Sequence, residues 1–354
     1  MKLVGLSGAV PRTRAPSTLA YDKFPPADVD RVVKNIGVLE HREAPLGTTA
    51  SDLCIAAAEP LLDALGWSRE SVDGLVFVTQ SPDYFLPGTA HRIQDVLKLG
   101  GDRCFCFDVN LGCSGYSHGL VVVEGLIRAG IMKRALLLCG EVTTDTIRPA
   151  VRNLLHQHDL GNSLMFGDAG TATALEAAEV SDVKASAWGA DGSGMHHISV
   201  PGGSFRCFWT PDLLAHQADE QGLPRRPVDL RINGAAVFNF TIRRVPPLAD
   251  ETLRRAGWQK ADVDAYVFHQ ANKFILEFLR KKMGIPEGKV PLSIEEFGNT
   301  SSASIPLTMV TRLAEPLSAG PLKTMSLGFG AGLSWSAVAM QTDRVKVLPL
   351  VEVG

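Results

Sequence analysis

The sequence predicts a duplicated α/β fold in which two pseudo-symmetric halves stack as α/β/α/β/α layers. Residues 61–78 (LLDALGWSRESVDGLVFV) and 252–269 (TLRRAGWQKADVDAYVFH) align without a gap, at an offset of 191 residues. The strand-like segments are apolar along their whole length, which is typical of a buried, mostly parallel sheet with helices on both faces. The chain has 354 residues, 45% of them hydrophobic, so it is long enough for two such halves.

The repeat predicts the order of strands and helices in each half. Each copy has the pattern of a helix end, a Gly–Trp stop, a turn that ends in Val–Asp, and an apolar strand. At nearly the same offset, residues 107–117 (FDVNLGCSGYS) lie opposite 295–304 (EEFGNTSSAS), and 133–141 (KRALLLCGE) lie opposite 323–331 (KTMSLGFGA). We therefore expect each half to run strand, helix, strand, helix.

The boundary between the halves is expected after the strand-like GTATALEAA. This places the first half at residues 1–178 and the second at residues 179–354, with a loop insertion at 202–228. A second aperiodic stretch lies at residues 148–162. Long insertions of this kind often form lids over a site.

Composition excludes several classes of protein. The net charge is −3 and there are no long Lys/Arg blocks, which argues against nucleic-acid or membrane partners. The N-terminal stretch lacks the apolar segment of a signal peptide and no run approaches the length of a membrane span, so we expect a cytoplasmic protein. The six cysteines are interpreted as buried small side chains with one reactive thiol, rather than as a disulfide framework.

Cys113 is the candidate reactive thiol. It follows an apolar strand and precedes a predicted helix, with Gly112 and Gly115 on either side of the Cys113–Ser114 pair. Open parallel sheets place their chemistry at the carboxyl ends of strands, and a helix N-terminus stabilises a thiolate. Taken alone, a small buried side chain at a tight strand–helix junction explains Cys113 equally well.

Two polar residues of the second half change that balance. His269 ends the repeated strand where the first copy has Val78, and Asn299 lies in the counterpart of the cysteine turn. Each has a structural explanation of its own, as a satisfied ring or a Gly–Asn turn. Because all three polar groups come from corresponding strand ends, together they favour a catalytic site.

The glycine-rich segment Gly328–Trp335 follows a predicted strand of the second half. It is not a phosphate-binding motif, because no Lys–Ser/Thr pair follows. Its backbone amides, together with that of Cys113, could instead form an oxyanion hole for a thioester carbonyl.

No metal site is expected. Cys104 and Cys106 alternate along a strand and face one layer, where packing is the simpler explanation. His156 and His158 lie in a predicted lid and His196–His197 lie in a turn, and neither pair has the i, i+4 spacing of helical metal ligands.

The motifs GCSGYSHGL, VFHQAN, FGNTSSASIP, FGDAGTATAL and GFGAGLSW resemble those of the thiolase-like superfamily. In their order, over nearly the whole chain, they are similar to β-ketoacyl-acyl-carrier-protein synthase III, the initiating condensing enzyme of type II fatty acid synthesis. The resemblance implies that Cys113 accepts an acyl group from acyl-CoA or an acyl-carrier thioester. It implies that His269 and Asn299 hold the carbonyl of malonyl-carrier protein during decarboxylation, and that no cofactor is needed.

The same resemblance assigns further positions. The backbone amides of Cys113 and Ala331 would form the oxyanion hole, with Ala331 standing where the family usually has glycine. Leu86 stands where the family inserts a side chain into the acyl pocket of a partner subunit, which implies a homodimer. Arg31, Asn35 and Phe274 stand where the family has a Trp and an Arg around the CoA adenine and an Arg for carrier docking. The candidate CoA or carrier contacts are Arg31, Asn35, Asn233, Asn272, Lys273 and Phe274.

Our main hypothesis is therefore decarboxylative Claisen condensation, in fatty acid or related secondary lipid or polyketide biosynthesis. The alternative is a thiolase-fold acyltransferase that passes the acyl group to an alcohol or amine without decarboxylation. A cysteine hydrolase and a non-catalytic partner subunit are two further possibilities. Loss of CO2 from a malonyl thioester separates the first two hypotheses.

Overall fold

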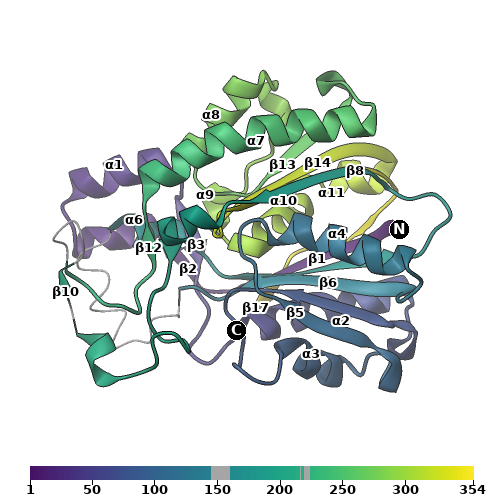
Figure 1. The fold of residues 1–354 in the computed structure, drawn as a ribbon, viewed down its shortest axis with the longest axis horizontal. Coiled ribbons are helices and arrows are strands. Elements are labelled where there is room, and N and C mark those ends of the chain that lie inside the picture. The colour runs from purple at the N-terminus through teal and green to yellow at the C-terminus, as the bar shows by residue number, and fades with distance from the viewer. Residues whose placement is uncertain (145–159, 216, 219–223) are drawn as a thin grey trace.

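The computed structural model describes the chain except for residues 145–159, 216 and 219–223. Figure 1 shows the five expected layers, with α2 and α3 below a first sheet, α4, α10 and α11 in the middle, and α7 and α8 above a second sheet. The predicted layered α/β/α/β/α architecture is confirmed.

The first sheet has seven strands. Their order is β16 (Lys346–Val347), β1 (Lys2–Pro11), β7 (Ala169–Glu176), β6 (Arg134–Glu141), β4 (Gly74–Val78) and β5 (Phe105–Val109), and β17 (Val351–Val353) also pairs with β1. β4 is parallel to β5 and β6, whereas β7 is antiparallel to both of its neighbours. The carboxyl ends of β4, β5 and β6 therefore lie at one edge of the sheet.

The second sheet differs from the expected parallel arrangement. Its four strands are β13 (Ala265–Phe268), β14 (Pro321–Gly330), β15 (Ser334–Asp343) and β8 (Val183–Ala190), and only β13 and β14 are parallel. The prediction of a mostly parallel sheet is wrong here. Residues 331–333 alone join β14 to β15, and so short a connection returns the chain antiparallel to itself.

The strand–helix–strand–helix order also fails in the second half. The counterpart of β5 is a short helix, α9 (Ile294–Phe297), and β13 pairs directly with β14. β5 has the sequence FCFDV, whereas α9 has IEEF, with adjacent glutamates in place of an apolar alternation. Gly298 then turns the chain with a φ of 63°, a conformation that favours glycine.

The repeat correctly predicts where two of the helices end. The helices are α1 (Pro26–Ile36), α2 (Ala50–Leu65), α3 (Thr89–Leu97), α4 (Gly115–Arg128), α6 (Leu160–Met165), α7 (Gly234–Ala256), α8 (Lys273–Met283), α10 (Ser304–Arg312) and α11 (Ala314–Ala319). The Gly–Trp stops occur in both copies, because Gly66 and Gly257 end α2 and α7 in the left-handed conformation, with φ of 64° and 69°.

Three buried hydrophobic clusters fill the spaces between the layers. The central cluster joins α4 and α10 to both sheets, through residues such as Leu120, Leu137, Val267 and Met309. Cys104 and Cys106 pack against the cluster beneath the first sheet, as expected from the strand pattern. The two central helices are thus packed between the sheets.

The two insertions are only partly described. Residues 145–159, with His156 and His158, lie outside the described residues. Within 202–228 the described parts are mostly irregular, with a 3-10 turn at Pro211–Leu214 and a ribbon of β10 (Gln217–Ala218) and β11 (Pro224–Arg225). Two more ribbons pair β2 (Arg14–Pro16) with β3 (Glu40–Arg42), and β9 (Ile198–Ser199) with β12 (Arg231–Ile232).

In the described part of the chain, no helix has the length and apolar character needed to cross a membrane.

Candidate active site

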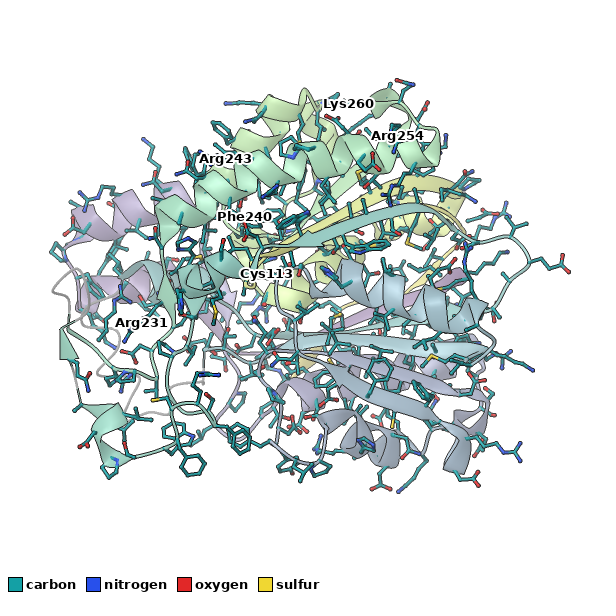
Figure 2. All side chains as sticks on the ribbon, viewed as in Figure 1. Cys113, Arg231, Phe240, Arg243, Arg254 and Lys260 are labelled. Carbon is teal, nitrogen blue, oxygen red and sulfur yellow. The ribbon has the colours of Figure 1, made fainter. Side chains whose placement is uncertain are left out.

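Cys113 lies near the centre of the molecule, in the turn between β5 and α4 (Figure 2). The protein packed around the thiol disfavours its charged form and raises the pKa of Cys113 to about 11. The Ser301 hydroxyl, whose Oγ lies 3.8 Å from Sγ, and the backbone amides of Cys113 and Ala331 act in the opposite direction. Burial therefore outweighs the lowering of this pKa that the sequence analysis expects from the helix N-terminus.

The glycine-rich segment of the second half meets the cysteine turn. A Cβ added to Gly330 would lie 2.6 Å from the Cβ of Cys113 and 3.1 Å from its sulfur, so only glycine fits there. Ser114 and Ser334 share a hydrogen bond between their Oγ atoms at 2.7 Å, and Ser336 Oγ donates to the Ser114 carbonyl at 3.1 Å. These contacts hold the amide of Ala331 close to the thiol.

Asn299 follows α9 and is 5% exposed. Its Oδ1 accepts a hydrogen bond from the backbone N–H of Ser301 at 2.9 Å. Ser301 has a φ of 49°, which costs a residue with a side chain about 1–3 kcal/mol, and this bond supports it. Because Oδ1 faces Ser301, the amide Nδ2 is the end of Asn299 that is left to donate to a ligand.

His269 follows β13 and is 1% exposed. Its Nδ1 lies 2.8 Å from Ser304 Oγ, and its ring meets Phe329 edge to face at 5.6 Å. Burial lowers the pKa of His269 to about 3, and a hydrogen bond with the Ser301 backbone opposes that shift only in part. The imidazole is therefore neutral near pH 7.

Ser301 joins these groups. Its Oγ faces Cys113, its N–H donates to Asn299, and its carbonyl accepts a hydrogen bond from Ser304, which holds His269. The structure thus brings Cys113, His269, Asn299 and Ala331 around one turn. Sequence reasoning missed Ser301 and Ser304, and the run of hydroxyl residues in NTSSAS is the signal that could have found them.

Glu141 is a third residue that sequence reasoning missed. It ends β6 and is fully buried, and its carboxylate accepts hydrogen bonds from Gln80 N at 3.1 Å, Ser81 Oγ at 3.0 Å and Thr79 Oγ1 at 3.3 Å. Burial raises the pKa of Glu141 to about 7, and its charge also disfavours the thiolate of Cys113. An acid at the end of an apolar strand, opposite Ala331 in the repeat, was the available signal.

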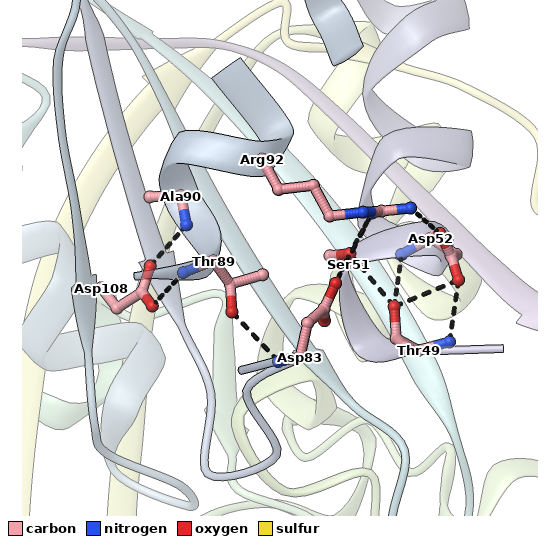
Figure 3. Close-up of polar contacts among 8 residues, drawn as sticks. All are labelled: Thr49, Ser51, Asp52, Asp83, Thr89, Ala90, Arg92 and Asp108. Carbon is pink, nitrogen blue, oxygen red and sulfur yellow. Dashed lines mark hydrogen bonds and ion pairs between the residues drawn. The ribbon is translucent and has the colours of Figure 1, made fainter. Parts of the chain in front are cut away.

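Leu86 lies apart from this cluster, on the loop between β4 and α3, and is 87% exposed. Figure 3 shows the polar contacts that hold the loop, made by Ser51, Asp52, Asp83 and Arg92 and called the loop clamp below. Asp83 accepts a hydrogen bond from Ser51 Oγ at 2.7 Å, and Arg92 pairs with Asp52 at 2.7 Å. The base of the loop is therefore fixed while Leu86 faces outward.

The remaining candidates lie on the helices around the site. Arg31 pairs with Asp28 at 2.7 Å on the exposed face of α1, which also carries the exposed Asn35. Asn233 and Asn272 are the N-caps of α7 and α8, where their Oδ1 atoms accept from backbone amides. Both asparagines therefore have a structural role that the sequence analysis did not assign.

The start of α8 combines a cation with an aromatic residue. Lys273 Nζ lies 2.6 Å from Glu295, and Phe274 is 55% exposed with its ring 5.5 Å from that of Phe238. Because Glu295 neutralises Lys273, the exposed aromatic ring is the main feature of this surface.

Comparison with known proteins shows which family the chain belongs to. Residues 107–192 match the family model for 3-oxoacyl-[acyl-carrier-protein] synthase III, and residues 253–342 match the model for its C-terminal part. A β-ketoacyl-[acyl-carrier-protein] synthase III of Deinococcus radiodurans is 31% identical over 88% of this chain and 86% of its own. A solved 3-oxoacyl-(acyl-carrier-protein) synthase of Burkholderia xenovorans is 40% identical, with a TM-score of 0.89 over 99% of this chain and 97% of its own.

A solved priming β-ketosynthase of the R1128 polyketide pathway is 27% identical, with a TM-score of 0.80 over 97% of this chain and 96% of its own. The fold and these relatives define a thiolase-like protein, a transferase of the condensing type. Within that class, the chain belongs to the β-ketoacyl-acyl-carrier-protein synthase III family.

Proposed function

We propose that the protein is an acyltransferase that loads an acyl group onto Cys113 and then condenses it with malonyl-carrier protein, with loss of CO2. The observation that carries this proposal is the single turn at Ser301, which contacts Cys113, Asn299 and the serine that holds His269. Relatives named as β-ketoacyl-[acyl-carrier-protein] synthase III and as a priming β-ketosynthase support the same reaction class.

In the first half-reaction, Sγ of Cys113 attacks the carbonyl carbon of an acyl thioester. The carbonyl oxygen becomes an oxyanion, which the backbone amides of Cys113 and Ala331 stabilise. Both amides already act on the sulfur, since each favours its anionic form. The thiol of CoA or of the donor carrier then leaves, and Cys113 holds the acyl group as a thioester.

In the second half-reaction, the malonyl thioester loses CO2 and becomes an enolate. Nδ2 of Asn299 and the ring of His269 hold the carbonyl oxygen on which the negative charge develops. The enolate carbon then attacks the acyl-Cys113 thioester and releases the 3-oxoacyl product. The burial of Asn299 and His269, at 5% and 1% exposed, supports this role because hydrogen bonds are strongest where water is excluded.

The proposal includes a homodimer. Leu86 lies in an exposed apolar surface that a single copy leaves uncovered, with Phe85, Phe205, Phe208 and Trp209 nearby in the sequence or the fold. Apolar surfaces of this kind mark interfaces. A partner subunit that covers it would receive Leu86, as the resemblance implies.

The proposal also includes a cytoplasmic location. All six cysteines are free, which fits this expectation.

The malonyl partner is proposed to be an acidic carrier protein. The exposed basic residues of α7 and α8 include Arg243, Arg244, Lys281 and Lys282. Figure 2 shows Arg243 on α7, above the layer that contains Cys113. Surface cations of this kind steer the encounter with an anionic partner.

The test is intact-mass spectrometry after incubation with a panel of acyl-CoA and acyl-carrier thioesters, followed by malonyl-carrier protein. We expect one acyl adduct, which malonyl-carrier discharges as a 3-oxoacyl product. Cys113→Ala should form no adduct, whereas Cys207→Ser should form it normally. An adduct that malonyl-carrier leaves intact would favour transfer to an alcohol or amine, and the absence of any adduct would contradict the proposal.

A further inference from the structure

The side chain of Gln80, near the start of the loop between β4 and α3, lies over the cysteine turn. A Cβ added to Gly112 would lie 1.8 Å from Oε1 and 2.4 Å from Cδ of Gln80, so the carboxamide occupies the space that glycine leaves open. The same added atom would lie 2.8 Å from Ser301 Oγ, which is itself 3.8 Å from Sγ of Cys113. The amide of Gln80 and the hydroxyl of Ser301 thus border one small space beside the thiol.

The backbone of Gln80 is held by the first sheet. Its N–H donates to both carboxylate oxygens of the buried Glu141, at 3.1 and 3.2 Å. The N–H of the preceding Thr79 donates to the Val109 carbonyl at 3.2 Å, which continues the pairing of β4 with β5. The sheet therefore fixes where the Gln80 side chain begins, and the side chain extends from there to Gly112.

The side-chain amide of Gln80 is available to a ligand. In the part of the chain that the structure describes, the hydrogen bonds of Gln80 use its backbone and none uses the side-chain amide. Gln80 is exposed, so water can satisfy this amide in the free protein. An acyl chain that covers the cysteine turn displaces that water, and a polar group that loses water without a new partner weakens binding.

We propose that Gln80 is a specificity-determining residue that favours acyl donors with a hydrogen-bonding group, such as a hydroxyl, on the third carbon of the acyl chain. The inference rests on the proposed function and names the class of donor that the protein uses. A carboxamide can both donate to a hydroxyl and accept from it. An unsubstituted chain would instead cover the amide with methylene groups.

The position of the amide along the acyl chain follows from the cysteine turn. The first carbon of the acyl group bonds to Sγ, and its oxygen faces the backbone amides of Cys113 and Ala331 in the proposed reaction. Gln80 borders Gly112, the residue before the thiol, and does not contact the sulfur. It is therefore placed to meet a group a few bonds further along the chain than the carbonyl.

The direct test is calorimetric binding to Cys113→Ala, which cannot be acylated at that position. The probes are butanoyl-CoA and the two enantiomers of 3-hydroxybutanoyl-CoA. We expect one enantiomer to bind about tenfold more tightly than butanoyl-CoA, because one net hydrogen bond is worth about that factor. Adding Gln80→Met, which keeps the length of the side chain, should weaken binding of that enantiomer and strengthen binding of butanoyl-CoA. Equal binding of all three probes to Cys113→Ala would overturn the proposal.

The kinetic test compares the same donors by intact-mass measurement of Cys113 acylation. At low donor concentration the preferred enantiomer should acylate the wild type about tenfold faster than butanoyl-CoA, and Gln80→Met should abolish this ratio. A residue that only supports its loop would change both rates by the same factor. That result in Gln80→Met would contradict the proposal.

The matched control is Gln341→Met. Gln341 is a partly exposed glutamine at the opposite end of β15 from Ser334, which contacts the cysteine turn. Its substitution should leave the ratio between the two donors unchanged. If no donor acylates the wild type, the proposed function fails, while the binding comparison still decides whether Gln80 selects the acyl group.

Discussion

The two halves carry different chemistry at equivalent positions of the repeat. In the first half, β5 leads to Cys113 and β6 ends at Glu141. In the second, the equivalent positions are Asn299, which follows α9, and Ala331, which follows β14, while His269 follows β13. The first half thus supplies the groups that can become anionic, a thiol and a carboxyl, and the second supplies neutral groups that can hold an anion or a proton.

This difference shows what a duplication contributes to a site. The repeated backbone directs corresponding strand ends to one point, where Gly330 of one half lies against Cys113 of the other. The chemistry depends on which side chain replaced an apolar residue at each end. The predictions below test whether the two halves have separate roles.

The largest effect is expected from the second half. Asn299→Ala and Asn299→Asp should each slow decarboxylation of a malonyl thioester by about 100- to 1,000-fold, because both remove the Nδ2 donor. The Asp variant keeps an oxygen that can accept from the N–H of Ser301. Acylation of Cys113 should change much less in both variants, measured by rapid-quench mass spectrometry.

The matched control for this prediction lies in the first half. Asn110 is an exposed asparagine that precedes the cysteine turn, much as Asn299 precedes the serine turn. Asn110→Ala should leave decarboxylation within about threefold of wild type. Full decarboxylation activity in Asn299→Asp would show that Asn299 only supports its turn.

The second prediction concerns the carboxyl of the first half. Burial raises the pKa of Glu141 from 4.5 to about 7, so the folded protein binds this proton more tightly than the unfolded chain. The contribution to stability is therefore full below pH 4.5 and is lost as the pH rises to about 7. Its size is about 3 kcal/mol.

The measurement is urea unfolding of wild type and Glu141→Gln between pH 4.5 and 7. The stability of the Gln variant relative to wild type should rise by about 3 kcal/mol over this range. His269 has the opposite dependence, because its lowered pKa makes stability rise with pH, but it contributes equally to both proteins. Glu59→Gln changes an exposed glutamate and is the control. Parallel stability curves for wild type and Glu141→Gln would refute the prediction.

The smallest effect is expected in the loops that follow β4 and β13, the strands of the two aligned copies. In the second half, only residues 269–272 join β13 to α8, whereas residues 79–88 join β4 to α3 and need the loop clamp. Arg92→Ala should raise amide hydrogen exchange in residues 83–90 about tenfold and cost less than about 1 kcal/mol of stability.

The control for the loop clamp is Lys98→Ala, which breaks an exposed pair with Asp95 at the end of the same helix. It should leave exchange in residues 83–90 unchanged. Because Arg92 lies outside the Ser301 turn, acylation of Cys113 by a short acyl donor should be normal in Arg92→Ala. Unchanged exchange in Arg92→Ala would mean that backbone contacts alone fix the loop.

The layers were predictable because a repeated sequence marks equivalent positions, and the same repeat indicated that Cys113, His269 and Asn299 would lie close together. The Gly66 and Gly257 stops followed from the same pattern. The second-half sheet was not predictable in this way, because an apolar strand has the same pattern in parallel and antiparallel pairing. Ser301 was also hidden, since a left-handed serine depends on the acceptor supplied by Asn299 and not on its own preference.

The last strands of the chain have a consequence for how the molecule folds. β16 and β17 both pair with β1, and Glu352 pairs with Arg42 at 2.9 Å, so the C-terminal residues complete the sheet that the N-terminal residues begin. A fragment that ended near residue 178 would leave β1 with an open edge able to pair with other chains. The first half therefore depends on the end of the chain to cover this edge of its sheet.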